Sequence, residues 1–403
     1  MVFVASPDVR HQIKSTMEVY LVGGAVRDTR LGLPVKERDW VVVGATPQDM
    51  LALGYQPVGR DFPVFLHPQS KEEYALARTE RKTGHGYTGF ETCADPATTL
   101  EQDLLRRDLT INAMAETPDG ELIDPYKGMD DLNNGLLRHV SPAFSEDPVR
   151  VLRTARFAAR FAPQGFHVAH DTNALMRRMV QNGEVSHLVA ERVWAELVKA
   201  LGTQTPARFF KVLAGCGALN VLFPELVPAD DSAVNKGHER DDLALPILEQ
   251  AVTLSTRTVI RFAALVCDMD NLHPGRVDDE VLTSFCDRYR VPNACRELAR
   301  LALLQRHLLQ AAAGLSAAAL LELLNSVDAF RRAERFNDLL LVCAADAAVC
   351  QRQLNNDYLQ QALATAKSIG TEALQQQGLS GRDIGLALQQ KRIEAIEHIR
   401  TGQ

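Results

Sequence analysis

Long apolar runs are missing from this chain of 403 residues: no stretch of about 18 consecutive apolar residues occurs, so we expect no membrane-spanning helix. Residues 1–16 lack a basic stretch followed by a long apolar one, which argues against a secretory signal and indicates a short, loosely ordered extension. The sequence also has no CxxC pair, and its seven cysteines follow no regular spacing (Cys93, Cys216, Cys267, Cys286, Cys295, Cys343 and Cys350). This pattern favours reduced thiols in a cytoplasmic protein.

An excess of basic charge is absent as well, because the formal net charge is −7 at pH 7. A negative net charge argues against non-specific nucleic-acid binding through a basic surface, but it is compatible with a local basic face. Hydrophobic residues make up 46% and charged residues 24% of the chain, as is usual for a globular protein. The length suffices for roughly two to four domains.

Strand-like and helix-like segments divide the chain unequally. Short β-branched runs separated by glycine and proline fill residues 19–140, whereas strand signals vanish from about Ser141 onward. We therefore predict an α+β N-terminal head followed by an all-α body. The predicted domains are a head (17–140), a helical neck (141–223) and a helical body with a tail (224–403). Helices are expected at 147–161, 171–181, 190–201, 206–215, 242–255, 257–268, 278–289, 293–311, 316–325, 328–350 and 355–368.

Two polar segments interrupt this pattern. Residues 83–98 have no apolar period and contain three glycines, which indicates a long mobile loop of the kind that tends to be functional. Residues 224–242 are polar and contain proline, which predicts a domain boundary. No internal repeat or low-complexity tract is found in the sequence.

The first motif lies between two apolar runs, 19–22 and 40–43, that are typical of buried strands. Gly23 and Gly24 follow the first run and precede a short helical pattern. Glycines let backbone N–H groups approach a ligand closely, and a helix N-terminus favours an anion. The sequence therefore predicts a phosphate-binding turn.

Two acidic residues open the second of these runs. Glu37 and Asp39 are two positions apart, so on a strand their carboxylates would lie on the same face, towards the phosphate-binding turn. Hard oxygen ligands beside a phosphate site suit Mg²⁺, with substrate phosphates completing its coordination. Glu73 is a candidate third carboxylate at the start of another strand-like run. From the residue types alone, a strand with solvated acids is an equally good interpretation.

The second motif is Arg106-Arg107-Asp108, followed by Thr110 and Asn112. Adjacent arginines cannot share a helix face, so one could reach a triphosphate while the other pairs with an acid. Thr110 and Asn112 offer short hydrogen-bonding side chains. An ordinary surface helix with a salt bridge is the competing interpretation, and this motif alone favours it.

The third motif is a predicted helix with Asp147 as N-cap and Pro148 at its first helical position. Four arginines follow within roughly 120° of the helical wheel: Arg150, Arg153, Arg156 and Arg160. Like charges repel, so this stripe requires anionic or hydrogen-bonding partners, unless it is simply a solvated basic face. Arginine without lysine favours recognition of phosphate, carboxylate or a base edge. Asp171, in the only His-Asp dipeptide, is expected to cap a helix rather than bind metal.

In this order and at these separations, the three motifs make the chain resemble the class II tRNA nucleotidyltransferases, the bacterial CCA-adding enzymes of the DNA polymerase β-like superfamily. The similarity is carried by LVGGAVRDTRLGLPVKERDWVVVG, RRDLTINA and EDPVRVLRTARFAARF, and it is continuous from about Val19 to about Leu222. The resemblance implies a polymerase β-like nucleotidyltransferase head and an RNA-binding helical body.

The resemblance also implies roles for individual residues. Glu37 and Asp39 match the family's metal-binding acidic pair, whose first member is often Asp, so the longer Glu37 could change the metal geometry. The positions that match nucleotide-binding residues are Gly24, Arg27, Arg107, Arg153 and Arg156. Asp147 and Arg150 match the pair that recognises the incoming base. The implied cofactor is Mg²⁺ and the implied partners are tRNA, ATP and CTP, with no membrane and no indication of oligomeric state.

Base chemistry agrees with these implied roles. A carboxylate accepts from the exocyclic amine of cytosine or adenine, whereas uracil and guanine would present a carbonyl to it at a cost of about 1–3 kcal/mol. Protein side chains could thus select C or A without a nucleic-acid template. The implied reaction is in-line attack of the RNA 3′-hydroxyl on the α-phosphate, assisted by two metal ions, with pyrophosphate leaving.

Many relatives of this type carry an HD phosphohydrolase site in the C-terminal half, where a His-Asp pair and further His and Asp ligands bind metal. At the matching place this chain has Cys267-Asp268, and residues 271–275 offer one histidine. Because imidazoles are the usual ligands, we expect no phosphatase or phosphodiesterase activity. Two alternatives stay open: a bacterial poly(A) polymerase, although the C-terminal segment is no extended basic tail, and a non-catalytic RNA-binding paralogue.

Overall fold

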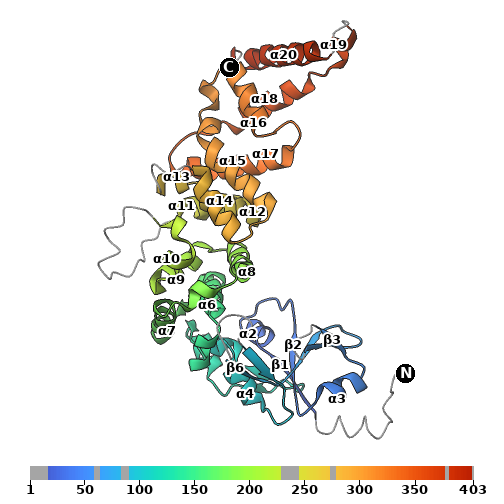
Figure 1. The fold of residues 1–403 in the computed structure, drawn as a ribbon, viewed down its shortest axis with the longest axis vertical. Coiled ribbons are helices and arrows are strands. Elements are labelled where there is room, and N and C mark those ends of the chain that lie inside the picture. Colours follow the sequence, from blue (N-terminus) through green and yellow to red (C-terminus); the bar gives the residue numbers. More distant parts are fainter. Residues whose placement is uncertain are drawn as a thin grey trace. The chain divides into compact units, whose positions relative to one another are not determined.

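The computed structural model describes residues 17–58, 64–82, 90–227, 245–272, 278–376 and 381–401. These residues form two compact units, and many of their elements are labelled in Figure 1. Unit 1 comprises residues 17–196 and 208–222, and unit 2 comprises residues 197–207, 223–227 and those from 245 onward. The predicted head and most of the predicted neck lie together in unit 1, and the division into three domains stays a prediction. The expected N-terminal extension, 1–16, lies outside the described residues.

A mixed sheet of seven strands belongs to unit 1, in the order β3-β4-β5-β2-β1-β8-β9. Its strands are β1 (Glu18–Val22), β2 (Asp39–Val43), β3 (Gln56–Val58), β4 (Val64–Leu66), β5 (Glu73–Leu76), β8 (Ala115–Glu116) and β9 (Leu122–Ile123). Neighbouring strands pair antiparallel except β2 and β5, which run parallel. The α+β head predicted from the sequence is confirmed.

Both faces of this sheet are covered at β2. Val41 and Val42 are adjacent on β2 and therefore point to opposite faces, and each belongs to a separate cluster of buried side chains. Helix α4 (Leu100–Leu105) packs into the Val41 cluster, and helix α3 (Pro47–Ala52) packs into the Val42 cluster. Strand β2 is thus held from both sides, which fixes the position of the residues at its ends.

A second antiparallel pair, β6 (Thr79–Lys82) and β7 (Phe90–Cys93), lies beside the predicted loop 83–98. Four residues of that loop therefore form a strand, and residues 83–89 lie outside the described residues. The sequence also gave no strand signal after Ser141, yet β11 (His167–Val168) pairs parallel with β10 (Leu136–Leu137). Two residues are too few to show the alternation that marks a strand in a sequence.

The remaining helices of unit 1 are α2 (Gly24–Arg30), α5 (Gly128–Asn133), α6 (Val149–Phe161), α7 (His170–Gln181), α8 (Ala190–Leu201), α9 (Ala207–Cys216) and α10 (Ala218–Leu222), with α8 and α9 extending into unit 2. The predicted N-cap role of Asp171 is wrong. Helix α7 begins one residue earlier, at His170, with Ala169 as N-cap. Asp171 instead lies in the first turn and accepts from Arg138 Nη1 at 3.1 Å.

The described part of unit 2 consists of helices, which confirms the predicted all-α body (Figure 1). They are α11 (Pro246–Leu254), α12 (Thr258–Val266), α13 (Met269–Leu272), α14 (Asp278–Arg288), α15 (Asn293–Gln310), α16 (Ala317–Ser326), α17 (Ala333–Val349), α18 (Asn356–Ser368), α19 (Glu372–Gln376) and α20 (Arg382–Thr401). Helix α17 starts later than the predicted 328–350, and Asp328 at the predicted start has a left-handed backbone with φ of 54°, which does not fit an α-helix. Within the described ranges, no helix has the length and hydropathy of a bilayer-crossing segment.

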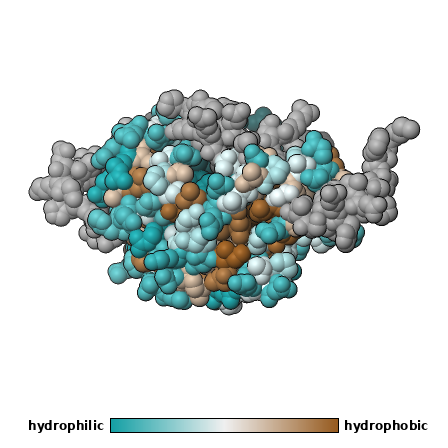
Figure 2. Space-filling view, turned by 90° about the horizontal axis from the view of Figure 1, so that it is seen from below, coloured by the Kyte–Doolittle hydropathy of each residue, from teal (hydrophilic) through white to brown (hydrophobic). Residues whose placement is uncertain are grey.

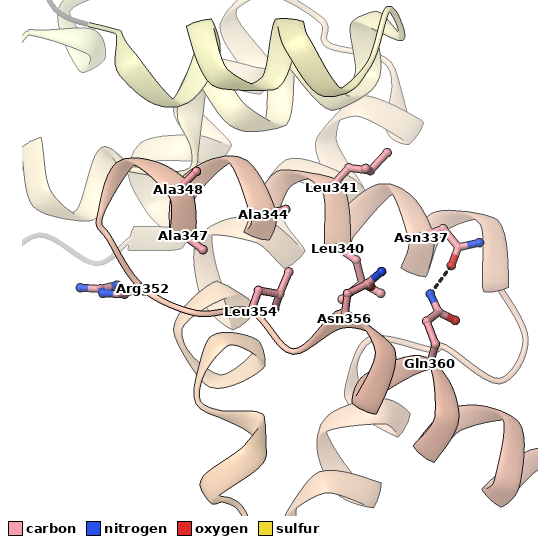
Figure 3. Close-up of a pocket in the computed structure, with 10 residues that line it drawn as sticks. All are labelled: Asn337, Leu340, Leu341, Ala344, Ala347, Ala348, Arg352, Leu354, Asn356 and Gln360. Carbon is pink, nitrogen blue, oxygen red and sulfur yellow. Dashed lines mark hydrogen bonds between the residues drawn. The ribbon is translucent and has the colours of Figure 1, made fainter.

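The surface is mostly hydrophilic in the view of Figure 2, with hydrophobic residues gathered in a central strip. In unit 2, α17 and α18 border a hollow of about 620 Å³ lined mainly by leucine and alanine (Figure 3). At one end of this hollow, Gln360 Nε2 donates to Asn337 Oδ1 at 2.7 Å. Nothing among the described residues shows what covers this apolar hollow.

Candidate active site

Two glycines shape the turn between β1 and α2. Gly23 has φ of 69°, which L side chains rarely adopt, and a Cβ there would lie 2.9 Å from Arg107 Nη1. The Gly23 N–H donates to Met114 O at 3.1 Å. Gly24 begins α2, and a Cβ there would make only ordinary contact, 3.5 Å from Arg27 Nη2. Gly23 is therefore the glycine that the turn requires, and Arg107 lies directly against it.

Acidic residues surround the start of β2. Asp39 is the first residue of this strand and pairs across the sheet with Val22, next to the glycine turn. Glu37 precedes the strand, so the predicted alternation along one strand does not apply to it. Partial withdrawal from water raises the pKa of Asp39, Arg107 opposes this rise and Glu37 adds to it. Glu73, the first residue of β5, is the parallel neighbour of Asp39 in the sheet.

The chemistry of these carboxylates fits a magnesium ion. Asp39 and Glu37 are both exposed and offer hard oxygen donors. Mg²⁺ is usually held by one or two protein carboxylates and takes its other ligands from water and substrate phosphates. A ready-made cluster of three or more His, Cys, Asp or Glu side chains is not found among the described residues. The predicted metal-binding role of Glu37 and Asp39 stays a prediction.

Arg27 is buried among protein groups. Its side chain is 3% exposed, and its guanidinium carbon lies 5.1 and 5.0 Å from the ring centroids of Phe157 and Phe161. The Arg27 Nε donates to Asp28 Oδ1 at 2.8 Å, and Nη1 donates to Asn112 Oδ1. Burial lowers the pKa of Arg27, while Asp28 acts in the opposite direction. The nucleotide contact predicted for Arg27 stays a prediction, and in this structure its donors serve the protein.

Asp103 of α4 holds both arginines of the second motif. This carboxylate is fully buried, accepts from Arg106 Nη2 at 2.8 Å and from Arg107 Nη2 at 3.1 Å. Burial alone would raise the pKa of Asp103, but Arg107 and Arg106 outweigh it and hold the pKa below its usual range. The sequence predicted an acid partner for one of the two arginines, whereas one carboxylate binds both. Arg107 is thereby fixed beside the glycine turn.

Asp108 links the second motif to the third. This buried carboxylate accepts from Asn112 Nδ2 at 2.9 Å and from Arg153 Nε at 2.8 Å. Burial alone would raise the pKa of Asp108, but Arg153 and Asn112 hold it far below its usual range. Because Asn112 also accepts from Arg27, the hydrogen bonds run without interruption from α6 to α2.

All four arginines of the α6 stripe form ion pairs or hydrogen bonds with other protein groups. The partners are Asp108 for Arg153, Glu196 for Arg156, Asp28 for Arg160, and the carbonyl oxygens of Ala143 and Arg106 for Arg150. The alternative of a solvated basic face is therefore wrong, and the predicted need for anionic or hydrogen-bonding partners is met inside unit 1. The nucleotide-binding roles of Arg150, Arg153 and Arg156 stay predictions.

Asp147 is oriented by a helix end and by one arginine. Helix α6 begins at Val149, one residue later than predicted, with Pro148 as its N-cap. Asp147 still acts on the helix end, since its Oδ1 accepts from the Val149 N–H at 3.1 Å. Arg192 Nη1 and Nη2 donate to Asp147 Oδ1 and Oδ2 at 3.0 and 2.8 Å. A base edge that reached Asp147 would meet a carboxylate already held by Arg192.

The sequence interpretation missed Arg192 and Glu196. Both lie on α8, four residues apart and therefore on one face of the helix, and they bind Asp147 and Arg156 of the third motif. The signal available in the sequence is this opposite-charge spacing. It equally suits a salt bridge within α8, so the spacing alone could not indicate partners on another element.

A buried arginine lies in unit 2 where the family resemblance would place an HD site. Arg306 of α15 is fully buried, with Nη2 3.6 Å from Asp268 Oδ1 and Nε 3.9 Å from Asp346 Oδ1. Burial raises the pKa of the neighbouring Cys267 thiol well above its usual value, which keeps it protonated. Asp268 and Asp346 therefore lie beside the guanidinium of Arg306. The expected lack of phosphohydrolase activity stays a prediction.

Two family models match the chain. Residues 19–138 match the model described as Poly A polymerase head domain, which includes the glycine turn, the acidic pair and the second motif. Residues 165–230 match the model described as Probable RNA and SrmB-binding site of polymerase A, which includes α7 and α9.

Similar proteins cover nearly the whole chain. Two proteins named Multifunctional CCA protein, from Thioalkalivibrio sulfidiphilus and Nitrosococcus oceani, are each 52% identical to it, over 96% and 94% of this chain and 99% and 98% of theirs.

Solved structures share the fold at lower identity. An apo CCA-adding enzyme matches with a TM-score of 0.65 at 22% identity, over 99% of this chain and 97% of its own. A CCA-adding enzyme with ATP matches with a TM-score of 0.64 at 23% identity, over 98% of this chain and 91% of its own. The Thermotoga maritima CCA-adding enzyme complexed with tRNA matches with a TM-score of 0.59 at 22% identity, over 100% of this chain and 97% of its own. Given 52% identity over nearly its full length, the chain belongs to the family of the multifunctional CCA proteins.

Proposed function

We propose that this protein adds C, C and A to the 3′ end of tRNA, using CTP and ATP and releasing pyrophosphate. Family membership supports this activity, as do the ATP and tRNA complexes of enzymes with the same fold. The observation that carries the proposal is the assembly at the start of β2. Asp39 pairs with Val22 beside the glycine turn, Arg107 lies against Gly23, and Glu37 acts electrostatically on Asp39.

The residues at this turn have complementary tasks. Asp39 and Glu37 would hold Mg²⁺, which supplies charge to activate the RNA 3′-hydroxyl and to stabilise the departing pyrophosphate. Arg107, fixed by Asp103, offers a positive charge beside the turn that suits a triphosphate. The left-handed Gly23 leaves no side chain between that guanidinium and the backbone of the turn.

Base selection is assigned to Asp147 and Arg150. The Asp147 carboxylate would accept from the exocyclic amine of C or A, in the orientation set by Arg192. Arg150 already donates to the carbonyls of Ala143 and Arg106, at 2.9 and 2.6 Å. To read a base edge with these donors, Arg150 would have to exchange at least one of these hydrogen bonds.

Three further expectations accompany the proposal. The reaction takes place in the cytoplasm, which the cysteine pattern favours. The cofactor is Mg²⁺. The body has no phosphohydrolase activity, because the buried Arg306 accompanies the acids there in place of imidazole ligands.

Nucleotide addition to a trimmed tRNA tests the function. The purified chain, Mg²⁺ and tRNA without its terminal CCA are incubated with each nucleoside triphosphate singly and together. We expect two C residues with CTP alone and a complete CCA with CTP and ATP, and no addition by Asp39→Ala. A long A tract would instead indicate a poly(A) polymerase, which the head-domain match also fits. No incorporation by the wild-type chain would contradict both enzyme assignments and favour a non-catalytic RNA-binding protein.

The assignment of base selection has its own test. Asp147→Ala should reduce the preference for C and A over U and G more than it raises the KM for the triphosphate, because Asp147 would contact the base rather than the phosphates. Unchanged nucleotide preference in this variant would contradict the assignment.

A further inference from the structure

Helix α8 is continuous, and the division between the two units falls within it, after Glu196. Its unit 1 part is attached at two places, because Arg192 pairs with Asp147 and Glu196 pairs with Arg156. Backbone hydrogen bonds between residues four apart run along an α-helix. The last turn of α8, which belongs to unit 2, therefore restricts the movement of its first turns.

A buried arginine of unit 2 holds the end of α8. Arg261 of α12 is 4% exposed, and its Nη1 donates to the carbonyl oxygens of Leu201 and Thr203, at 2.7 Å each. Its Nε donates to the carbonyl oxygen of Ser255 at 2.8 Å. Leu201 is the last residue of α8, so this single guanidinium joins the helix end to the chain that follows it and to the segment before α12.

A guanidinium suits this place electrostatically. The last carbonyl groups of an α-helix have no partner within the helix, and they carry the negative end of its dipole. Burial lowers the pKa of Arg261, but a guanidinium keeps its charge at neutral pH. Without Arg261, the carbonyl oxygens of Leu201 and Thr203 would lose this donor, which is unfavourable away from water. The last turn of α8 would then be free to move.

We propose that Arg261 is a positioning residue for base selection, which acts through α8 on Arg192 and thereby on Asp147; the proposal rests on the proposed function. Arg192 holds the Asp147 carboxylate through two hydrogen bonds, at 3.0 and 2.8 Å, and a bidentate pair requires both donors in line. A small rotation of α8 would disturb this pair and the Glu196–Arg156 pair together. A residue of unit 2 thus contributes to a choice that is made in unit 1.

Nucleotide preference separates positioning from a general loss of stability. Arg261→Met removes the donors, and Arg261→Lys keeps the charge with a single ammonium group. The matched control is Arg335→Met, because Arg335 also holds a helix end in unit 2: its Nη2 donates to the carbonyl oxygen of Val327, the C-cap of α16, at 3.1 Å. The kcat/KM values for CTP and UTP are measured with tRNA lacking its terminal CCA. We expect Arg261→Met to lower the preference for CTP about fivefold, Arg261→Lys to give an intermediate preference, and the control to keep the wild-type value.

Hydrogen exchange provides a measurement that does not require activity. The exchange of backbone amides is followed by mass spectrometry in α8 (190–201) and around the start of α6 (147–153). We expect Arg261→Met to exchange faster than the wild type in both segments, because both depend on the position of α8. The control Arg335→Met should exchange like the wild type in both.

A glycine within α8 gives a second test if Arg261→Met does not fold. Ala195 is exposed and lies between Arg192 and Leu201, so Ala195→Gly loosens the helix between its two attachments and removes only a methyl group. Ala364→Gly is the matched control, since Ala364 is an exposed alanine inside α18. We expect a lowered preference for CTP in Ala195→Gly and the wild-type preference in Ala364→Gly.

Three outcomes would overturn the inference. They are an unchanged preference for CTP in folded Arg261→Met, an equal fall in Arg335→Met, and a loss of kcat/KM by the same factor for CTP and UTP, which would mean that Arg261 only stabilises the fold. If Arg261→Met does not fold, an unchanged preference in Ala195→Gly overturns it. Faster exchange at 147–153 in Arg261→Met, in a chain whose wild type adds no CCA, would uphold the link through α8 and contradict the proposed function.

Discussion

Arg192 and Asp147 form a bidentate ion pair between α8 and the start of α6. Both guanidinium Nη atoms donate to the carboxylate, at 3.0 and 2.8 Å, and the Val149 N–H adds a third donor at 3.1 Å. The Asp147 side chain nevertheless stays 24% exposed. A carboxylate held by three donors has a fixed direction for its remaining lone pairs. Arg192 is therefore a positioning residue for the proposed base recognition.

Arg192→Gln should weaken base selection. Without the guanidinium, the Asp147 carboxylate can rotate, and we expect the preference for CTP over UTP to fall about tenfold, equivalent to about 1.4 kcal/mol. Arg192→Lys keeps the charge but lacks the planar fork, so an intermediate preference is expected. The measurement is the ratio of kcat/KM values for the two triphosphates. A variant with full preference would show that Arg192 only stabilises the fold.

Substitution of Asp39 should abolish most of the C addition, whereas substitution of Glu37 by the shorter acid should be tolerated. Asp39→Asn is expected to lower the rate of C addition by about 10²–10³-fold, because a neutral amide binds Mg²⁺ poorly. Glu37→Asp shortens the side chain and should keep the rate within about tenfold while changing the Mg²⁺ concentration needed for half-maximal rate. Rates are measured over a range of Mg²⁺ concentrations.

Glu73→Gln is the comparison for that series, because Glu73 is the parallel neighbour of Asp39. A loss as large as that of Asp39→Asn would make Glu73 a third metal ligand. Near wild-type activity in Asp39→Asn would contradict the metal assignment altogether.

The sequence predicted the order of the motifs and the class of each unit, because these depend on local patterns. Apolar runs predicted β1 and β2, and helical periodicity predicted most of the helices to within a few residues. The helix predicted from residue 328 does not include Asp328, whose backbone has a positive φ that hydrophobic periodicity does not reveal. Helix α7 begins at His170, one residue before the predicted start, and the pairing of β11 with β10 just before it involves too few residues to be seen in the sequence.

Partners across the fold could not be predicted in the same way. The spacing of the α6 arginines indicated that they need partners, but it could not name Asp28, Asp108 or Glu196. Arg27 and the glycine turn matched a nucleotide-binding motif, yet the burial of Arg27 against Phe157 depends on how α2 and α6 pack. Such pairings follow from tertiary packing, which residue spacing does not encode.

Gly23 and Gly24 should respond differently to alanine. Gly23→Ala forces a side chain into a backbone conformation with φ of 69° and towards Arg107 Nη1, and we expect a loss of about 1–3 kcal/mol in unfolding free energy. The KM for CTP should rise as well, because Arg107 must move. Gly24→Ala places its methyl group at the start of α2 in ordinary contact and should change stability by less than about 1 kcal/mol. Equal effects in thermal denaturation would contradict the special role of Gly23.

The buried Asp108 should make stability depend on pH in the acid range. Its pKa in the folded chain lies below the value of about 3.9 expected in the unfolded chain, so the unfolded state takes up the proton first as the pH falls. The stabilisation by Asp108 is therefore complete well above pH ~4 and is lost progressively below it. Asp108→Asn should lose about 2 kcal/mol at pH 7, because Arg153 keeps a weaker partner, and should show a shallower decline on acidification.

Apparent melting temperatures between pH 7 and pH 3 measure both effects of Asp108. Asp119→Asn is the matched control, since Asp119 is an exposed acid in a turn of the same unit. We expect this control to keep the wild-type melting temperature at pH 7 and the wild-type decline below pH ~4. If Asp108→Asn declined as steeply as the wild type, the acid sensitivity would have to arise from other carboxylates, of which Asp103 between Arg106 and Arg107 is the next candidate.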